Sequence, residues 1–203
     1  CFGAVEDTAH LNGHSVSRIH ADLSGGEALD LTAAGLLAEN LNTSFIGTQK
    51  GGAFEIEGRV ARAWLRLPNV NSRSNADVLR PWANGQDVTR RPSDQWIVDF
   101  DNEMDELAAS MYEKVFAHLE VHVKPQRLRN SDVASHRYWW VHQRTRPELR
   151  VKLAGISRYA ATARVAKHRY FVWMEVCVLP DSRLCAIARA DDTTFGLLSS
   201  RIH

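Results

Sequence analysis

The stretch ISRYAATARVAKHRYFVW, residues 156–173, decides how the chain is interpreted. Its aromatic and β-branched residues, in YAATARV and again in RYFVWMEVCV, predict two strands, and RLCAIA farther on predicts a third. On and between these strands stand Arg158, Arg164, Lys167, His168 and Arg169, and the stretch contains no acidic residue. The sequence therefore predicts a buried sheet with a concentrated positive charge beside it.

The charge extends upstream of this stretch. Between Lys124 and Tyr170 there are twelve lysines and arginines against only Asp132 and Glu148, although the whole chain has a formal net charge of +1. A block of one sign can be a solvated face, but a basic field beside a neutral remainder more often attracts a polyanion. Charge alone does not distinguish DNA from RNA.

Hydrophobic periodicity predicts helices around this sheet. The clearest helix covers 104–123, with apolar residues at three- and four-residue steps, Asn102 as its cap and Pro125 at its end. Further helices are expected over 31–41, 58–67, 126–141, 147–154 and from Asp191 onward, and a buried strand over 95–100. The fold class is therefore α/β (α+β mixed), a small mixed sheet with an inserted helical subdomain.

Composition excludes several classes of protein. Hydrophobic residues make up 44% of the chain, as in globular domains, and no apolar run is long enough to cross a bilayer. No signal-peptide pattern stands at the start. Cys1, Cys177 and Cys185 do not form a disulfide framework, which favours a reducing cytoplasm. No membrane partner is expected.

Two patterns could hold a metal ion. Asp99 and Asp101 follow the strand at 95–100, where a stand-alone metal-dependent nuclease would place its acids. The start of the following helix explains these acids without a metal. The pairs His10/His14 and His118/His122 have helical spacing, but neither has a third ligand nearby, so surface histidines explain them better. No metal site is predicted.

Two other motifs also favour structural roles. GTQKGG, residues 47–52, is not a phosphate-binding loop, because its lysine precedes the glycine pair and no Ser or Thr follows, so it predicts a tight turn. Tyr138, Trp139 and Trp140 could stack on bases. Adjacent positions of a helix cannot all face the same way, which favours packing for at least one of them.

Several segments in a fixed order resemble one known family. They are FIGTQKGGAFEI (45–56), NADVLRPWANGQDVTRRPSDQWIVDF (75–100), HVKPQRLRN (122–130), RYWW (137–140), RPELR (146–150), SRYAATARVAKHRYFVW (157–173) and FGLLSSRIH (195–203). Together they resemble the target recognition domain of MmeI-type bacterial DNA adenine methyltransferases, which belong to type II restriction–modification enzymes. The resemblance covers nearly the whole chain.

The resemblance implies a division of the chain. Residues 1–44 would be the tail of the preceding methyltransferase catalytic domain, and 45–203 a target recognition domain truncated at its C-terminus. The family's catalytic domain binds S-adenosylmethionine and holds a flipped adenine with an Asn/Asp-Pro-Pro-aromatic motif. None of the six prolines here is adjacent to another. The fragment itself is therefore expected to be non-catalytic and to bind no cofactor.

The resemblance also implies roles for the basic residues. Lys124, Arg127, Arg129 and Arg137, with Arg158, Arg164, Lys167, His168 and Arg169, would contact DNA phosphates. Arg164, Lys167 and Arg169 are also candidates for reading guanine edges. Ser182 and Arg183 match a segment that, by this resemblance, would set specificity. The implied partners are double-stranded DNA and the upstream methyltransferase domain of the same polypeptide, in the bacterial cytoplasm. An RNA-binding module remains an alternative, although no RNP-type aromatic motif is present.

Overall fold

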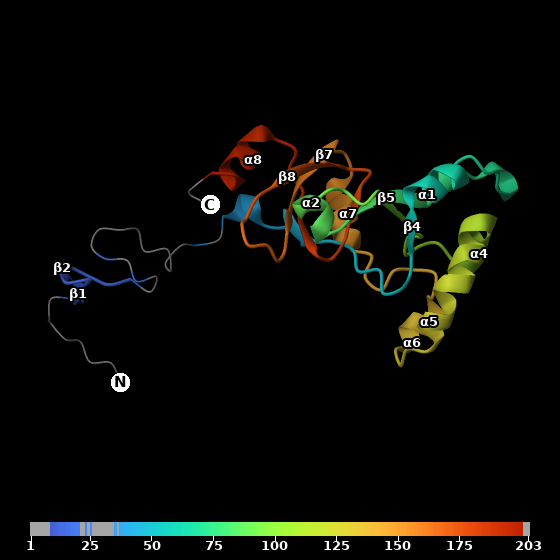
Figure 1. The fold of residues 1–203 in the computed structure, drawn as a ribbon, viewed down its shortest axis with the longest axis horizontal. Coiled ribbons are helices and arrows are strands. Elements are labelled where there is room, and N and C mark those ends of the chain that lie inside the picture. Colours follow the sequence, from blue (N-terminus) through green and yellow to red (C-terminus); the bar gives the residue numbers. More distant parts are fainter. Residues whose placement is uncertain (1–8, 21–22, 24, 26–34, 36, 201–203) are drawn as a thin grey trace. The chain divides into compact units, whose positions relative to one another are not determined.

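The computed structural model describes residues 9–20, 23, 25, 35 and 37–200 (Figure 1). The chain divides into two compact units, one ending at Leu41 and one beginning at Asn42. In the first unit, β1 (Ala9–Leu11) and β2 (His14–Val16) form an antiparallel hairpin whose turn is the Asn12-Gly13 pair, a residue pair typical of such turns. The helix expected over 31–41 lies mostly outside the described residues, and its end is a 3-10 turn, η2 (Ala38–Asn40).

The second unit contains two four-stranded sheets. The first has the antiparallel order β3-β10-β7-β8 and consists of β3 (Ser44–Ile46), β7 (Arg158–Ala163), β8 (Val172–Glu175) and β10 (Leu184–Ile187). The second has the order β4-β6-β5-β9 and consists of β4 (Glu55–Glu57), β5 (Leu79–Ala83), β6 (Gln95–Val98) and β9 (Leu179–Pro180). The β5–β9 pair is parallel and the other pairs of this sheet are antiparallel. The mixed α/β class is confirmed, and the strands form two sheets where one was expected.

Short helices surround these sheets. They are α1 (Gly58–Trp64), α2 (Gly85–Thr89), α3 (Glu106–Ser110), α4 (Glu113–His122), α5 (Lys124–Leu128), α6 (Val133–Arg137), α7 (Pro147–Leu153) and α8 (Asp192–Leu198), with 3-10 turns η3 (Val70–Ser72) and η4 (Asn75–Asp77). In sequence, α3 to α6 stand between the strands of the two sheets and form the expected helical insertion. In Figure 1, α8 and β8 lie at one end of this unit, and α1 and α4 at the other.

The helix predicted over 104–123 is divided in two. It begins at Glu106 with Asp105 as its cap, because the Asp105 carboxylate accepts a hydrogen bond from the Ala108 amide at 2.7 Å. It breaks at Tyr112, whose ψ of 65° is not helical. The Tyr112 side chain is buried and donates a hydrogen bond to Asp77 at 3.1 Å. The hydrogen bond to Asp77 stabilises the broken helix. Local periodicity does not reveal a partner that is distant in sequence.

The largest apolar cluster forms between the second sheet and the helical insertion. Phe54, Ile97, Phe100 and Leu119 are fully buried within it. A smaller cluster joins α7 to the first sheet, where Leu149 and Leu153 pack against strand residues such as Tyr159. Each sheet therefore packs against its own helices. The second unit depends on contacts that join one sheet and its helices to the other.

A backbone crossing supplies one of these contacts. After β3 the chain runs across the segment that leads from β9 to β10, and the Thr48 amide donates to Pro180 O at 2.8 Å while the Ser182 amide donates to Thr48 O at 2.8 Å. At Gly47 a β-carbon would collide with the carbonyl oxygens of Pro180 and Asp181. Only glycine allows the two backbones to come this close.

A buried ion pair supplies the second contact. Asp99, just after β6, accepts two hydrogen bonds from the Arg150 guanidinium of α7, at 2.7 and 2.8 Å. Arg80 and His142 approach the same carboxylate, at 3.2 and 3.5 Å. Burial acts to raise the pKa of Asp99, but the hydrogen bonds from Arg150 and the neighbouring positive charges hold it below its ordinary value. The second sheet is thereby fastened to the helix that covers the first.

We predict that Asp99→Asn lowers the free energy of unfolding by about 3 kcal/mol at neutral pH, because it removes one partner of a buried charge pair. The folded-state pKa of Asp99 is depressed, so this contribution is present above the unfolded pKa and is lost as the pH falls through the folded value. Urea denaturation at neutral and acidic pH should therefore show the difference between wild type and variant shrinking in acid.

The matched control is Asp94→Asn. Asp94 also makes a bidentate pair with an arginine, Arg62, at 2.7 and 2.9 Å, but this pair is exposed. Exposed pairs contribute little, so the control should leave the urea midpoint nearly unchanged. An equal effect of the two substitutions would contradict a bracing role for Asp99.

Candidate functional site

The loop that joins β7 to β8, residues 164–171, carries most of the charge of the opening stretch. Arg164, Lys167, His168 and Arg169 are all exposed in this loop. Its base is anchored, since the Arg169 guanidinium donates to Ala163 O at 2.5 Å and Tyr170 donates to Val88 O at 2.9 Å. The strand predicted over residues 169–178 is confirmed only as β8, because the chain before Val172 belongs to this loop.

Ser182 and Arg183 lie against the same loop. The Arg164 amide donates to Arg183 O at 2.8 Å, and the Arg164 guanidinium donates to Ser182 O at 3.0 Å. The Arg183 side chain is 75% exposed. Residues predicted from two distant segments are therefore brought together, and we call Arg164, Lys167, His168, Arg169, Ser182 and Arg183 the β7–β10 basic patch.

Arg158 stands apart from this patch. Its guanidinium lies 3.9 Å from the centre of the Trp173 ring and donates to Asp192 at 2.8 Å. Trp173 in turn stacks on Phe195 of α8, with ring centres 4.6 Å apart. The charge of Arg158 is thus compensated within the protein, and this side chain holds α8 to the first sheet. The predicted DNA contact of Arg158 therefore competes with a structural role, and it stays a prediction.

The prediction that Arg127 contacts a DNA phosphate is corrected, because this side chain is buried. The residue is 3% exposed, and its guanidinium donates to Lys50 O at 3.0 Å, Val141 O at 2.7 Å and the Ser135 hydroxyl at 3.2 Å. Burial lowers the pKa of Arg127, with the charge of Asp132 acting in the opposite direction. A side chain enclosed in this way cannot reach a phosphate, so Arg127 is a structural cation at the junction of α5, α6 and the turn at Lys50.

The other three predicted phosphate contacts lie on the helical insertion. Lys124 sits 4.5 Å from the centre of the Trp139 ring and pairs with Glu120 at 3.3 Å. Arg129 and Arg137 are exposed. They belong to α5 and α6 and not to the sheet that carries the β7–β10 basic patch, so the predicted set occupies separate elements of the unit.

Sequence reasoning missed a set of polar side chains on the turn after β3, near the β7–β10 basic patch. Gln49 pairs with Arg144 in an isolated antiparallel bridge, and the Gln49 side chain donates to the Gln143 side chain at 3.0 Å. Lys50 pairs with Glu55. Burial lowers the pKa of Lys50, with Asp181 and Arg183 close enough to contribute. The turn in GTQKGG was confirmed, but the polar residues on it gave no separate signal.

The candidate metal ligands are occupied by protein contacts. Asp99 belongs to the buried ion pair, and Asp101 accepts from the amides of Glu103 and Met104, both at 3.0 Å. The rings of His118 and His122 lie 4.4 Å apart, with His118 packed against Trp64. Within the residues that the structure describes, no group of three or more His, Cys, Asp or Glu is placed to hold a metal ion.

The aromatic cluster is mostly packing, as predicted. Trp139 and Trp140 are buried, and their indole nitrogens donate to Glu106 at 3.0 Å and to Met104 O at 2.9 Å. Tyr138 is exposed and makes an edge contact with Trp140, with ring centres 6.0 Å apart. Only Tyr138 of the three therefore has a ring available to an external partner.

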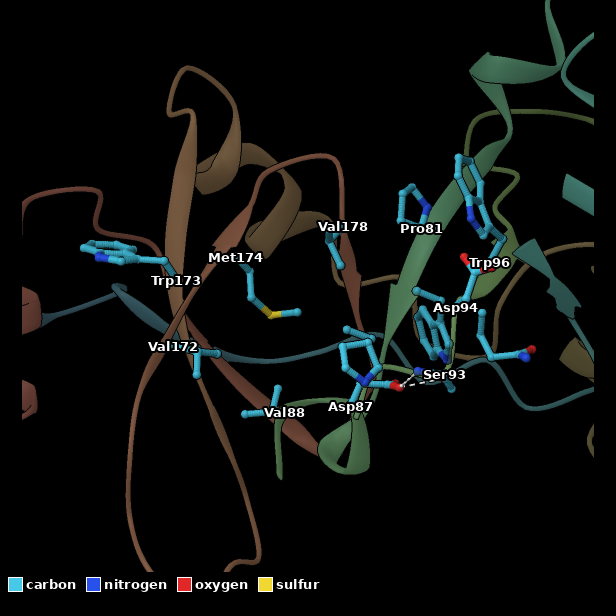
Figure 2. Close-up of a pocket in the computed structure, with 14 residues that line it drawn as sticks. Pro81, Asp87, Val88, Ser93, Asp94, Trp96, Val172, Trp173, Met174 and Val178 are labelled. Carbon is cyan, nitrogen blue, oxygen red and sulfur yellow. Dashed lines mark hydrogen bonds between the residues drawn. The ribbon is translucent and has the colours of Figure 1, made fainter. Parts of the chain in front are cut away.

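A mainly apolar cavity of about 370 Å³ lies between β5 and β8 (Figure 2). Met174 and Val178 face it, whereas the ring of Trp173 points away. Of the two carboxylates that line it, Asp87 completes the capping box of α2, accepting from the Asn84 amide at 2.8 Å and from the Ser93 hydroxyl at 2.6 Å. Asp94 pairs with Arg62. Both carboxylates thus have partners within the protein, and the lining of this cavity does not indicate acid–base chemistry.

Comparison with known proteins gives one informative result. No protein-family model matches the chain, and no curated protein matches it. Among solved structures, the fold is similar to part of the Type IIL restriction–modification enzyme MmeI, determined in complex with DNA, with a TM-score of 0.61 and 16% sequence identity. The match covers 92% of this chain and 24% of that chain, so this chain spans about a quarter of the length of MmeI. A likeness at this identity shows the fold.

Among the residues that the structure describes, no helix has the length and apolar character required to cross a membrane.

We predict that Arg127→Ala destabilises the fold by about 3 kcal/mol, because it leaves two buried carbonyls and a hydroxyl without their charged donor. Arg129→Ala, on an exposed side chain two residues away, should leave stability unchanged. Thermal and urea unfolding of both variants would measure the contrast. If Arg127→Ala unfolded like the wild type, the structural role given to this guanidinium would be wrong.

Proposed function

We propose that this chain is the DNA-recognition part of an S-adenosylmethionine-dependent DNA adenine methyltransferase of the restriction–modification type. The observation that carries the proposal is the β7–β10 basic patch, in which the β7–β8 loop and the segment before β10 present cations beside one another. The fold likeness to MmeI, an enzyme solved with DNA, supports the same reading. Exposed Arg144 adds positive charge on the neighbouring turn, where it is bridged to Gln49.

Binding would begin with phosphate contacts. Exposed cations such as Lys167 and Arg183 neutralise backbone phosphates and release counterions, which gives affinity without sequence preference. Arg164 and Arg169 have less freedom, because their guanidinium groups are fastened to Ser182 O and Ala163 O. Side chains held in one orientation are suited to contact base edges, where geometry decides specificity.

The methyl transfer itself is assigned to another part of the polypeptide. S-adenosylmethionine would supply the methyl group there, and the target adenine would be extruded toward that domain. This chain has no pair of adjacent prolines that could form the family's adenine-binding motif. Its own contribution is to hold the duplex in register while the reaction takes place elsewhere.

We predict that duplex DNA binding weakens steeply with salt, and that the double variant Lys167→Ala/Arg183→Ala reduces the slope of log K against log [salt] by about 2, one for each lost phosphate contact. The measurement is fluorescence anisotropy of a labelled random-sequence duplex over a range of salt concentrations. An RNA duplex of the same sequence in competition tests the RNA-binding alternative.

The matched control is Arg59→Ala/Arg66→Ala, which removes the same charge from exposed arginines on and after α1. Its salt slope should equal that of the wild type. Binding that is insensitive to salt, or an equal loss in both double variants, would refute the proposed interface.

A further inference from the structure

Two glutamine side chains form an ordered pair on the surface beside the β7–β10 basic patch. Gln49 Nε2 donates to Gln143 Oε1 at 3.0 Å, and the pair is exposed. Ordering two long side chains costs about as much conformational entropy as one exposed hydrogen bond returns. The arrangement therefore contributes little to stability.

The backbone holds Gln143 from two sides. Its amide donates to Lys50 O at 3.2 Å, and the next residue, Arg144, is bridged to Gln49. The turn at Gly51 has φ of +68°, and a β-carbon there would lie 2.8 Å from Gln143 Cβ and 3.0 Å from its Oε1. Glycine at this position thus lets the turn close directly against the Gln143 side chain.

The hydrogen bond couples the orientations of the Gln49 and Gln143 amides, so that neither amide can turn over alone without losing it. If the amide turned over, its NH₂ group would face the NH₂ group of Gln49, and the hydrogen bond would be lost. One lone pair of Gln143 Oε1 is used by Gln49, so the amide retains one acceptor site and its N–H donors. The structure records no other partner for this side chain among the described residues.

This pattern is the complement of one base edge. In the major groove adenine presents an acceptor, N7, beside a donor, the N6 amino group, whereas guanine presents two acceptors. A glutamine amide with a free donor and a free acceptor pairs with adenine in bidentate fashion. Exposed Arg144, bridged to Gln49, and exposed Arg183 supply positive charge near the pair that would attract a duplex.

We propose that Gln143 reads an adenine in the recognised DNA sequence and that Gln49 is its positioning residue. The inference rests on the proposed DNA-recognition function. It assigns specificity to the turn after β3 and the segment before α7, in addition to the β7–β10 basic patch. Gln143 touches the base, and Gln49 acts through the orientation of the Gln143 amide.

The test starts with selection of binding sites from a random duplex pool by the wild-type chain and by Gln143→Ala. The wild-type pool should contain a position enriched in adenine that the variant pool lacks, with the other positions retained. At that position, replacing adenine by 7-deazaadenine removes the N7 acceptor. It should weaken wild-type binding by about 2- to 12-fold, the range for one hydrogen bond of the bidentate pair, and should not weaken Gln143→Ala further.

Two further variants separate reading from positioning and from structure. Gln49→Ala should reduce the adenine preference without abolishing it, because the Gln143 amide remains but is free to rotate. Gln126→Ala removes another exposed glutamine and should leave the preference unchanged. All three variants should unfold at the wild-type urea midpoint, which excludes misfolding as the cause.

The outcomes distinguish this inference from the proposed function. If Gln143→Ala selects the same site as the wild type, or if the wild type binds duplex without any enriched adenine, the reading role is overturned while DNA binding stands. If the wild type does not bind duplex DNA at all, the proposed function fails and the inference fails with it.

Discussion

The backbone crossing at Gly47 is the constraint on which the rest of the second unit depends. Residues 47–50 lie so close to the segment before β10 that no side chain fits at residue 47, and hydrogen bonds at Thr48 lock the two segments together. This contact sets the position of Gln49 and Lys50 relative to Arg183. It also fixes where β10 enters the first sheet, between β3 and β7. The surface that carries the proposed function is therefore assembled by a contact between backbones, and the side chains that form it depend on that contact for their spacing.

The positive charge of the protein is divided between cations that hold the fold together and cations that remain exposed. Arg127 is buried and Arg150 is half-buried, and both make hydrogen bonds that join separate elements. Arg158 is neutralised by Asp192 and stacks on Trp173. Lys167 and Arg183 remain exposed. Buried guanidinium groups serve the fold because they donate in several directions at once, and a buried arginine must satisfy those donors. The basic block in the sequence therefore contains two populations of side chains that serve different purposes, and only the exposed one is available to a polyanion.

Sequence reasoning succeeded where structure is local. The turn at residues 12–13, the start of α7 at Pro147 and the strand at 95–98 all follow from short-range signals. It failed where a distant partner decides the outcome. The break at Tyr112 depends on Asp77, and the burial of Arg127 depends on Lys50 O, 77 residues away in the chain. The candidate site shows the same division, since residues 164–169 were found from composition, whereas Gln49 and Gln143 become a pair only through folding across 94 residues.

The β7–β8 loop is fastened at its two ends, by Arg164 to Ser182 O and by Arg169 to Ala163 O. Between these anchors, in the described structure, the side chains of residues 165–168 form no hydrogen bond or ion pair, and Val165 is 93% exposed. Ala166 packs against the apolar cluster of Ala83, Ala163 and Leu184, whereas Val165, Lys167 and His168 are exposed. Substitutions at these three exposed positions would therefore change the surface offered to a partner while leaving the scaffold intact. The preference of this surface for a partner could therefore change through a few substitutions in the loop, and the protein would stay folded at every step.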